Sequence, residues 1–389
     1  MSAPLGGLKV QTFLADYWQK RPCLVRQAFP GFQPELEADD VAGLACDELA
    51  ESRLVTGSYP EHDWSLRHGP FTERELRQLP ESGWTLLVQD VEKHYPPLQS
   101  LLANFRFVPS WRLDDLMISV AATGGSVGPH FDQYDVFLLQ AAGHRRWQIA
   151  THFDPVLLGD CELNVLQSFA PEQEWELEPG DMLYLPPGVA HHGVALDSGM
   201  TWSIGLRAPS QADLLLALGE WLAEKAQEGE RYKDGPLDAK PRPGEISPGA
   251  LEGLLGLLAS APGSGQESAE FLGNFLTRYR LAHQPVPPET GIDERELARQ
   301  LTGQACLQRN PWTRLAWIEH AARARLFASG EEFACSIELA QQLCATPLAL
   351  PPGVPTDSAC LGTLCQLLNA GHLFLDESPN WHDKPVFTV

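Results

Sequence analysis

The chain has 389 residues, which is too long for one ordinary domain and predicts two or three. Its 28 basic and 51 acidic residues give a formal net charge of −23, so we expect it to repel nucleic acid and attract a basic partner, although such a charge also simply favours solubility. The eight cysteines are scattered without a CxxC pair, the start resembles no signal peptide and no apolar run is long enough to span a membrane, which together predict a cytoplasmic protein.

The first predicted domain covers residues 1–207 and is rich in β-structure. A helix is predicted over residues 10–20, and short strand-like runs broken by Gly and Pro occur at 113–125, 135–143, 144–150 and 180–188. Short strands with frequent turn signals favour a barrel or sandwich over a sheet built from βαβ units.

Residues 208–285 are predicted to form a helical region. Helical patterns occur at 210–228, 251–260 and 269–282, with a Pro- and Gly-rich linker at 234–249 between the first two. Their apolar faces could pack within the chain or against a second copy, and we expect a homodimer.

Residues 286–389 predict a winged-helix-like domain, because helices are followed by short strands. We expect a helix at 293–301, two strands within 313–336 with a turn at Ser329 and Gly330, a helix at 337–346, and a helix running into a strand at 361–376.

The segment GPHFDQYDVFLLQ carries the first chemical signal. His130 and Asp132 are two residues apart in a predicted strand, so both side chains should point into one cavity. An imidazole and a carboxylate so placed form two corners of a facial metal triad, although a His-x-Asp pair alone is often only structural.

The segment GDMLYLPPGVAHHG supplies the third corner. A strand runs into a Pro-Pro-Gly turn, after which His191 should point back into the mouth of the barrel, whereas the adjacent His192 should face the opposite side. Two histidines and one carboxylate leave room for a chelating cosubstrate and dioxygen, which is typical of Fe(II) oxygenases.

The strand after His144 presents Arg145 and Trp147 on one face and Arg146 and Gln148 on the other. A guanidinium pointing inward suits the far carboxylate of 2-oxoglutarate, because the two groups pair through two hydrogen bonds.

Four segments in this order resemble the bacterial ribosomal oxygenases of the JmjC class in the cupin superfamily: residues 114–140, 143–149, 177–195 and 202–209. The resemblance is strongest from about Pro109 to Pro209 and extends in plan to the rest of the chain. It implies a mixed α and β fold: a double-stranded β-helix, or jelly roll, then a helical dimerisation region and a winged-helix-like end.

The resemblance also implies roles for individual residues. His130, Asp132 and His191 fall on the iron ligands, and Arg145 falls on the arginine that binds 2-oxoglutarate. Positions lining the substrate pocket correspond to Asp115, Met117, Tyr134 and Ser203. Where the family has a small hydroxyl that assists the cosubstrate, this chain has Ala121, so Ser119 or Thr123 is expected to serve instead.

The activity that the resemblance implies is hydroxylation of a protein side chain with Fe(II), 2-oxoglutarate and dioxygen. The expected substrate is an arginine of a basic ribosomal protein, large-subunit protein L-sixteen, modified at the β-carbon. Other functions stay open: a related oxygenase that acts on a histidine of another ribosomal protein, on another protein or on a small molecule, a non-catalytic cupin-like binding protein, and a metal-sensing regulator that binds DNA through its winged helix. The net charge of −23 and the lack of a helix dense in Lys and Arg oppose the DNA-binding regulator, so we expect no direct contact with nucleic acid.

Overall fold

The structure is a computed structural model that describes residues 3–159, 161–225, 231, 233, 248–259, 265–278, 285–302, 305–345 and 357–376. These residues fall into two compact units. One unit contains residues 1–208, 285–312 and 342–389, and the other contains 209–284 and 313–341.

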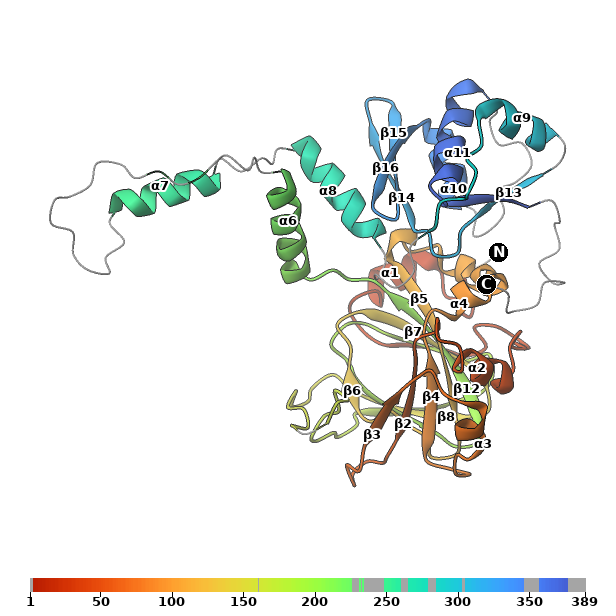
Figure 1. Cartoon of the computed structure of the whole chain (residues 1–389). Helices are drawn as coiled ribbons and strands as arrows, with labels where there is room; N and C mark the ends of the chain where they lie inside the picture. The colour runs from red at the N-terminus through yellow and green to blue at the C-terminus, as the bar shows by residue number, and fades with distance from the viewer. Residues whose placement is uncertain are drawn as a thin grey trace. The chain divides into compact units, whose positions relative to one another are not determined.

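An eight-stranded antiparallel sheet forms the larger wall of the first unit (Figure 1). Its strands, in spatial order, are β1 (Cys23–Val25), β10 (Met182–Leu185), β7 (Asp135–Ala142), β12 (Gly199–Leu206), β5 (Leu113–Ala121), β4 (Trp84–Val88), β2 (Ser52–Thr56) and β3 (Ser65–His68).

A four-stranded sheet forms the opposite wall. It has the order β6 (His130–Phe131), β11 (Ala190–Ala195), β8 (Arg145–Ala150) and β9 (Gln173–Leu177). The chain crosses repeatedly between the two sheets, which confirms the predicted double-stranded β-helix.

Alternation along the strands divides the large sheet into two faces. Ile118 and Trp202 are fully buried on the outer face, in a core formed with the N-terminal segments. Met117 and Ser203, one residue away from each, therefore face the smaller sheet. The site is built on that inner face.

Short helices cover the outer face of the large sheet and connect its strands. They are α1 (Val10–Asp16), α2 (Ala38–Leu44), α3 (Glu73–Arg77), α4 (Val91–His94) and α5 (Gln99–Leu102), with 3-10 turns η1 (Pro96–Leu98), η2 (Ala103–Phe105) and η3 (Ser110–Arg112). Thr72 and Glu75 form a capping box at the start of α3, as a hydroxyl followed three residues later by a carboxylate predicts.

The first unit also includes α9 (Glu294–Thr302), α11 (Ser358–Asn369) and a two-stranded sheet of β13 (Cys306–Arg309) and β17 (Leu373–Asp376). The Asp357 carboxylate accepts hydrogen bonds from the N–H groups of Ala359 and Cys360, which caps α11. The expected helix at 293–301 and the helix-to-strand transition at 361–376 are confirmed.

The second unit contains α6 (Gln211–Lys225), α7 (Pro248–Ala259), α8 (Gly265–Thr277) and the sheet β14 (Leu315–His320), β15 (Arg323–Ala328) and β16 (Glu331–Cys335). Gly273 lets α8 approach this sheet, since a Cβ there would lie 2.3 Å from the ring of Phe327. Helix α10 (Ile337–Ala345) follows β16.

Two strands were expected over 313–336, and this was wrong, because the segment forms three. Ala321 and Ala322 make the additional turn, with φ angles of 48° and 59°. Alanine gives no turn signal of the kind that Gly or Asn provides at positive φ. The expected linker at 234–249 lies outside the described residues apart from its last two. Among the described residues, no helix has the length and apolar character needed to cross a membrane.

Candidate active site

The inner face of the large sheet carries polar residues in cross-strand rows. Ser119 pairs with Leu87 on β4 and Thr201 on β12, and Thr201 pairs with Gln140 on β7. The next row places Met117 opposite Ser203. Side chains directly opposite each other in a sheet share a face. Polar groups from β5, β7 and β12 therefore meet in one interior.

The opposite wall supplies the candidate metal ligands. His130 on β6 pairs directly with His191 on β11, so both imidazoles share the inner face. Their ring centroids are 4.2 Å apart. The Asp132 carboxylate lies 3.9 Å from Nε2 of His130 and 3.6 Å from Nε2 of His191. One ligand atom from each of the three residues lies within 4.8 Å of the others.

Hydrogen bonds from both rings direct their Nε2 atoms to the centre of this triad. Nδ1 of His130 lies 2.9 Å from the carbonyl oxygen of Gly128, and Nδ1 of His191 lies 3.0 Å from that of Val189. An Nδ1–H that donates to a carbonyl leaves the Nε2 lone pair for a metal. Burial and the neighbouring His130 lower the pKa of His191 to about 4, so its ring is the neutral form that metals require.

His192 points away from the triad, as alternation predicts. It lies beside Tyr59 and Phe169, with ring centroids 5.7 Å and 6.1 Å away. Within the part of the chain that the structure describes, neither of its ring nitrogens has a hydrogen-bond partner. It belongs to the packing on the outer face of the small sheet.

Arg145 enters the same interior from β8 and is only 4% exposed. Its guanidinium donates to the Thr201 hydroxyl at 3.4 Å and to the Gly193 carbonyl oxygen at 3.2 Å, while Nε has no hydrogen-bond partner among the residues described. No carboxylate among the described residues forms an ion pair with it. Burial lowers the pKa of Arg145 to about 10, so it is still charged at neutral pH. A buried cation without a counter-ion is costly and suits an anionic ligand.

Gly193 and Thr201 position the Arg145 side chain, the first by leaving space and the second by a hydrogen bond. A Cβ at Gly193 would lie 2.7 Å from Nε of Arg145, so the absence of a side chain there makes room for the guanidinium. The Thr201 hydroxyl, which accepts from Arg145, donates to Oε1 of Gln140 at 3.0 Å. The Ser119 hydroxyl donates to the backbone oxygen of Thr201 at 3.2 Å.

Arg146 lies on the other face of β8. Its side chain is 38% exposed and lies 4.0 Å from Glu174. Thr123, the alternative to Ser119, is exposed in the turn after β5. Of these two pairs of candidates, Arg145 and Ser119 are therefore the ones inside the barrel.

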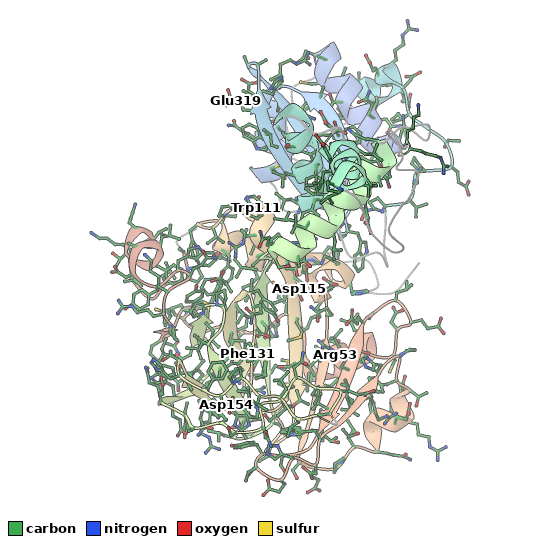
Figure 2. The ribbon with its side chains drawn as sticks, turned by 90° about the vertical axis from the view of Figure 1, so that its left-hand side faces the viewer. Arg53, Trp111, Asp115, Phe131, Asp154 and Glu319 are labelled. Carbon is green, nitrogen blue, oxygen red and sulfur yellow. The ribbon has the colours of Figure 1, made fainter. Side chains whose placement is uncertain are left out.

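Asp115 lies at the end of the inner face, on β5, and is 8% exposed (Figure 2). Burial first, and then the charges of Glu92, Asp114 and Asp90, raise the pKa of Asp115 well above its ordinary value, against only a small opposing effect of Lys93. The carboxylate accepts a hydrogen bond from Gln89 and has no ion pair among the described residues. Its carboxyl group is therefore buried among other carboxyl groups, and the arrival of a cation would favour its charged form.

The other residues expected to line the substrate pocket are Met117, Ser203 and Tyr134. Met117 and Ser203 are opposite each other on β5 and β12. Tyr134 is 43% exposed, and desolvation together with the carboxylates of Asp132 and Asp115 raises its pKa. Tyr134 thus lies near both the triad and Asp115.

Four contributors were not named from the sequence: Thr201 and Gly193, which contact Arg145, Gln89, which contacts Asp115, and Arg53, which contacts Gln89 and Met117. Thr201 had a signal, because it lies two residues before Ser203 in a strand and must share its face. Arg53 lies on β2 and Gln89 directly follows β4, two strands that were not among those predicted from the sequence.

Two family models match the chain. The JmjC domain matches residues 100–214, and a ROXA-like winged helix matches residues 266–374. The second match confirms the winged-helix class predicted for the end of the chain.

The chain is similar to curated proteins over most of its length. It is 32% identical over 371 residues to the ribosomal protein uL16 3-hydroxylase of Escherichia coli K12, covering 94% of this chain and 97% of the relative. It is 40% identical over 212 residues to a probable ribosomal oxygenase of Haemophilus influenzae, covering 53% and 51%.

Solved structures agree. The crystal structure of E. coli YcfD matches with a TM-score of 0.82 and 31% identity, covering 97% of this chain and all of that one. The same ribosomal oxygenase in complex with cobalt and 2-oxoglutarate matches with a TM-score of 0.78 and 31% identity, covering 95% and 99%.

Proposed function

The chain belongs to the JmjC-domain ribosomal oxygenases, and we propose that it is an Fe(II)- and 2-oxoglutarate-dependent oxygenase that hydroxylates the β-carbon of an arginine in large-subunit ribosomal protein L-sixteen (uL16). The observation that supports this most strongly is the joint presence, in one barrel, of the His130, Asp132 and His191 triad and of buried Arg145 and Asp115, neither of which forms an ion pair within the described part of the chain.

The triad fits Fe(II), because its donors are two imidazole nitrogens and one carboxylate oxygen, and Nδ1 of each ring lies at hydrogen-bond distance from a backbone carbonyl oxygen. When bound, Fe(II) supplies the redox chemistry that couples decarboxylation of 2-oxoglutarate with dioxygen to insertion of one oxygen atom into a C–H bond, leaving succinate and carbon dioxide. The protein residues bind and orient the two substrates.

Arg145 is proposed to bind the far carboxylate of 2-oxoglutarate, with Ser119 nearby. The positive charge of the buried guanidinium supports this, because its hydrogen-bond partners among the described residues are a hydroxyl and a backbone carbonyl, which carry no negative charge. A dicarboxylate would provide the missing counter-charge and pair with the guanidinium through two hydrogen bonds.

Asp115 is proposed to bind the substrate guanidinium, with Met117, Tyr134 and Ser203 lining the pocket. A carboxylate whose neighbours are mostly carboxylates gains most from an arriving cation. With the guanidinium held there, the aliphatic part of the side chain extends toward the triad. Tyr134 provides an aromatic face close to Asp132.

Purified protein supplied with Fe(II), 2-oxoglutarate and air tests this proposal. Basic ribosomal-protein peptides that contain one arginine should gain one oxygen atom, whereas matched peptides with lysine should react poorly because an ammonium does not reproduce the planar fork. Equal reaction of lysine and arginine peptides would contradict the guanidinium pocket. Reaction of a histidine peptide instead would favour the histidine-hydroxylase alternative.

We also propose a cytoplasmic location, a homodimer, and three domains with the limits 1–207, 208–285 and 286–389. The dimer is supported by exposed leucines in the helical region: Leu215 at 60%, Leu216 at 72%, Leu251 at 51% and Leu255 at 56%. Apolar helix faces of this kind are commonly buried in an oligomer. Light scattering that gives a mass near the 42.8 kDa of one chain would contradict it.

A further inference from the structure

The end of β4 contributes a side chain to the pocket around Asp115. Gln89 follows Val88, the last residue of β4, and lies two residues after Leu87, whose partner on β5 is Ser119. In an extended chain, residues two apart share a face. Gln89 therefore faces the same interior as Ser119 and Asp115.

Three hydrogen bonds fix Gln89. Its backbone N–H donates to the carbonyl oxygen of Glu51 at 2.9 Å. Its side-chain Oε1 accepts from Nη2 of Arg53 at 3.2 Å, and its Nε2 donates to Oδ2 of Asp115. Arg53 and Asp115 both come from the large sheet of the barrel (Figure 2).

The charges on either side determine which way the amide points. Arg53 offers only donors and the Asp115 carboxylate only acceptors, so a reversed amide would place donor against donor and acceptor against acceptor. Neither charged group has an ion pair among the described residues. Gln89 thus lies as an oriented neutral dipole between a half-buried cation and a buried anion.

The second oxygen of Asp115 is confined by the backbone. A Cβ at Gly205 would lie 2.7 Å from Oδ1 of Asp115, so the carboxylate is close to the β12 main chain at a position without a side chain. With Oδ2 bound by Gln89, the plane of the carboxylate is set. A guanidinium binds through two parallel hydrogen bonds only when that plane is correctly oriented.

We propose that Gln89 is a positioning residue of the arginine pocket, which holds the Asp115 carboxylate in the orientation that a substrate guanidinium requires and is itself held by Arg53. This inference rests on the proposed function. Gln89 acts on arginine recognition alone and does not take part in binding 2-oxoglutarate, because the hydrogen bonds of Arg145 and Ser119 among the described residues go to Thr201 and Gly193 and not to Gln89.

The test is Gln89→Met, which keeps the length of the side chain and removes the amide. We expect KM for an arginine peptide that the wild-type protein hydroxylates to rise about tenfold or more, as for loss of a hydrogen bond to a charged group. The KM for 2-oxoglutarate and kcat should stay within about twofold. Gln89→Asn keeps the amide but is too short to span both partners, so it should show the same rise and serves if the Met variant does not fold.

A double-mutant cycle separates positioning from a general structural effect. If Gln89 acts through Asp115, then adding Gln89→Met to Asp115→Asn should cause almost no further rise in peptide KM, whereas independent effects would multiply. The matched control is Gln148→Met, which removes a Gln–carboxylate hydrogen bond to Glu174 of 2.6 Å outside the pocket and should leave peptide KM unchanged.

Failure of this inference differs from failure of the proposed function. Wild-type turnover of the arginine peptide, with unchanged peptide KM in both Gln89 variants or with multiplicative effects in the cycle, overturns the inference alone. Absence of turnover of any arginine peptide by the wild-type protein overturns the proposed function and this inference with it.

Discussion

Replacing Arg145 by Ala should raise the KM for 2-oxoglutarate far more than replacing Arg146. Arg145 is 4% exposed and has no carboxylate partner in the described part of the chain, so an incoming dicarboxylate would give this buried guanidinium an ion pair. Truncating one partner of a buried, hydrogen-bonded charge pair costs about 2–5 kcal/mol. Each 1.4 kcal/mol of lost binding free energy weakens binding about tenfold. The KM should therefore rise by roughly 30-fold to several thousand-fold.

Arg146→Ala is the matched control, because the two arginines are adjacent on β8 and Arg146 lies on the outer face with a side chain that is 38% exposed. Exposed ion pairs contribute about 0–1 kcal/mol, so its KM should change by at most about fivefold. Succinate release at saturating peptide measures both variants, and thermal unfolding shows whether each is folded. Equal rises in the two variants, or a larger rise in Arg146→Ala, would refute the reasoning.

Three further predictions concern neighbouring residues. His191→Ala should lose stoichiometric Fe(II) in metal analysis after dialysis while His192→Ala keeps it, and full iron content in both would remove His191 from the ligand set. Gly193→Ala should raise the KM for 2-oxoglutarate with little effect on peptide KM, since its Cβ would lie 2.7 Å from Nε of Arg145; an unchanged value would show that Arg145 does not need this space. Peptide affinity should fall as the pH is lowered through the raised pKa of Asp115, at a higher pH than for an ordinary aspartate, because the protonated carboxyl loses the charge that binds a guanidinium. Isothermal titration measures this, and the same pH dependence in Asp115→Asn would assign it to another group.

Much of the inner site could be predicted from local pattern. His130 and Asp132 share a face because strand side chains alternate, and the same rule separates His191 from His192 and Arg145 from Arg146. To assign each of these side chains to a face, one needs only to recognise the strand and to know which way one of its residues points. The two-residue period of a strand then gives the face of every other residue in it.

The residues that were missed depend on pairing between distant strands. Gln89 reaches Asp115 across 26 positions of sequence, and Arg53 reaches Met117 across 64. No local period specifies which strands become neighbours or in which register. The room that Gly193 and Gly205 leave for Arg145 and Asp115 is likewise visible only once the strands are paired.

The same limit applies to the winged-helix end. Its helices at 294–302 and 358–369 follow from apolar spacing and caps, whereas the turn at Ala321 and Ala322 follows from the register between β14 and β15. Alanine is not among the residue types that favour positive φ, so these two positions leave no signal in the sequence.

Mass spectrometry of ribosomal proteins from cells with and without this gene tests the central claim most directly. The account predicts that one arginine of ribosomal protein L-sixteen gains the mass of a single oxygen atom only when the gene is present, and that cells expressing the His191→Ala variant lack the modification. An identical L-sixteen arginine in both strains, or gene-dependent oxidation confined to a histidine of another ribosomal protein, would contradict it.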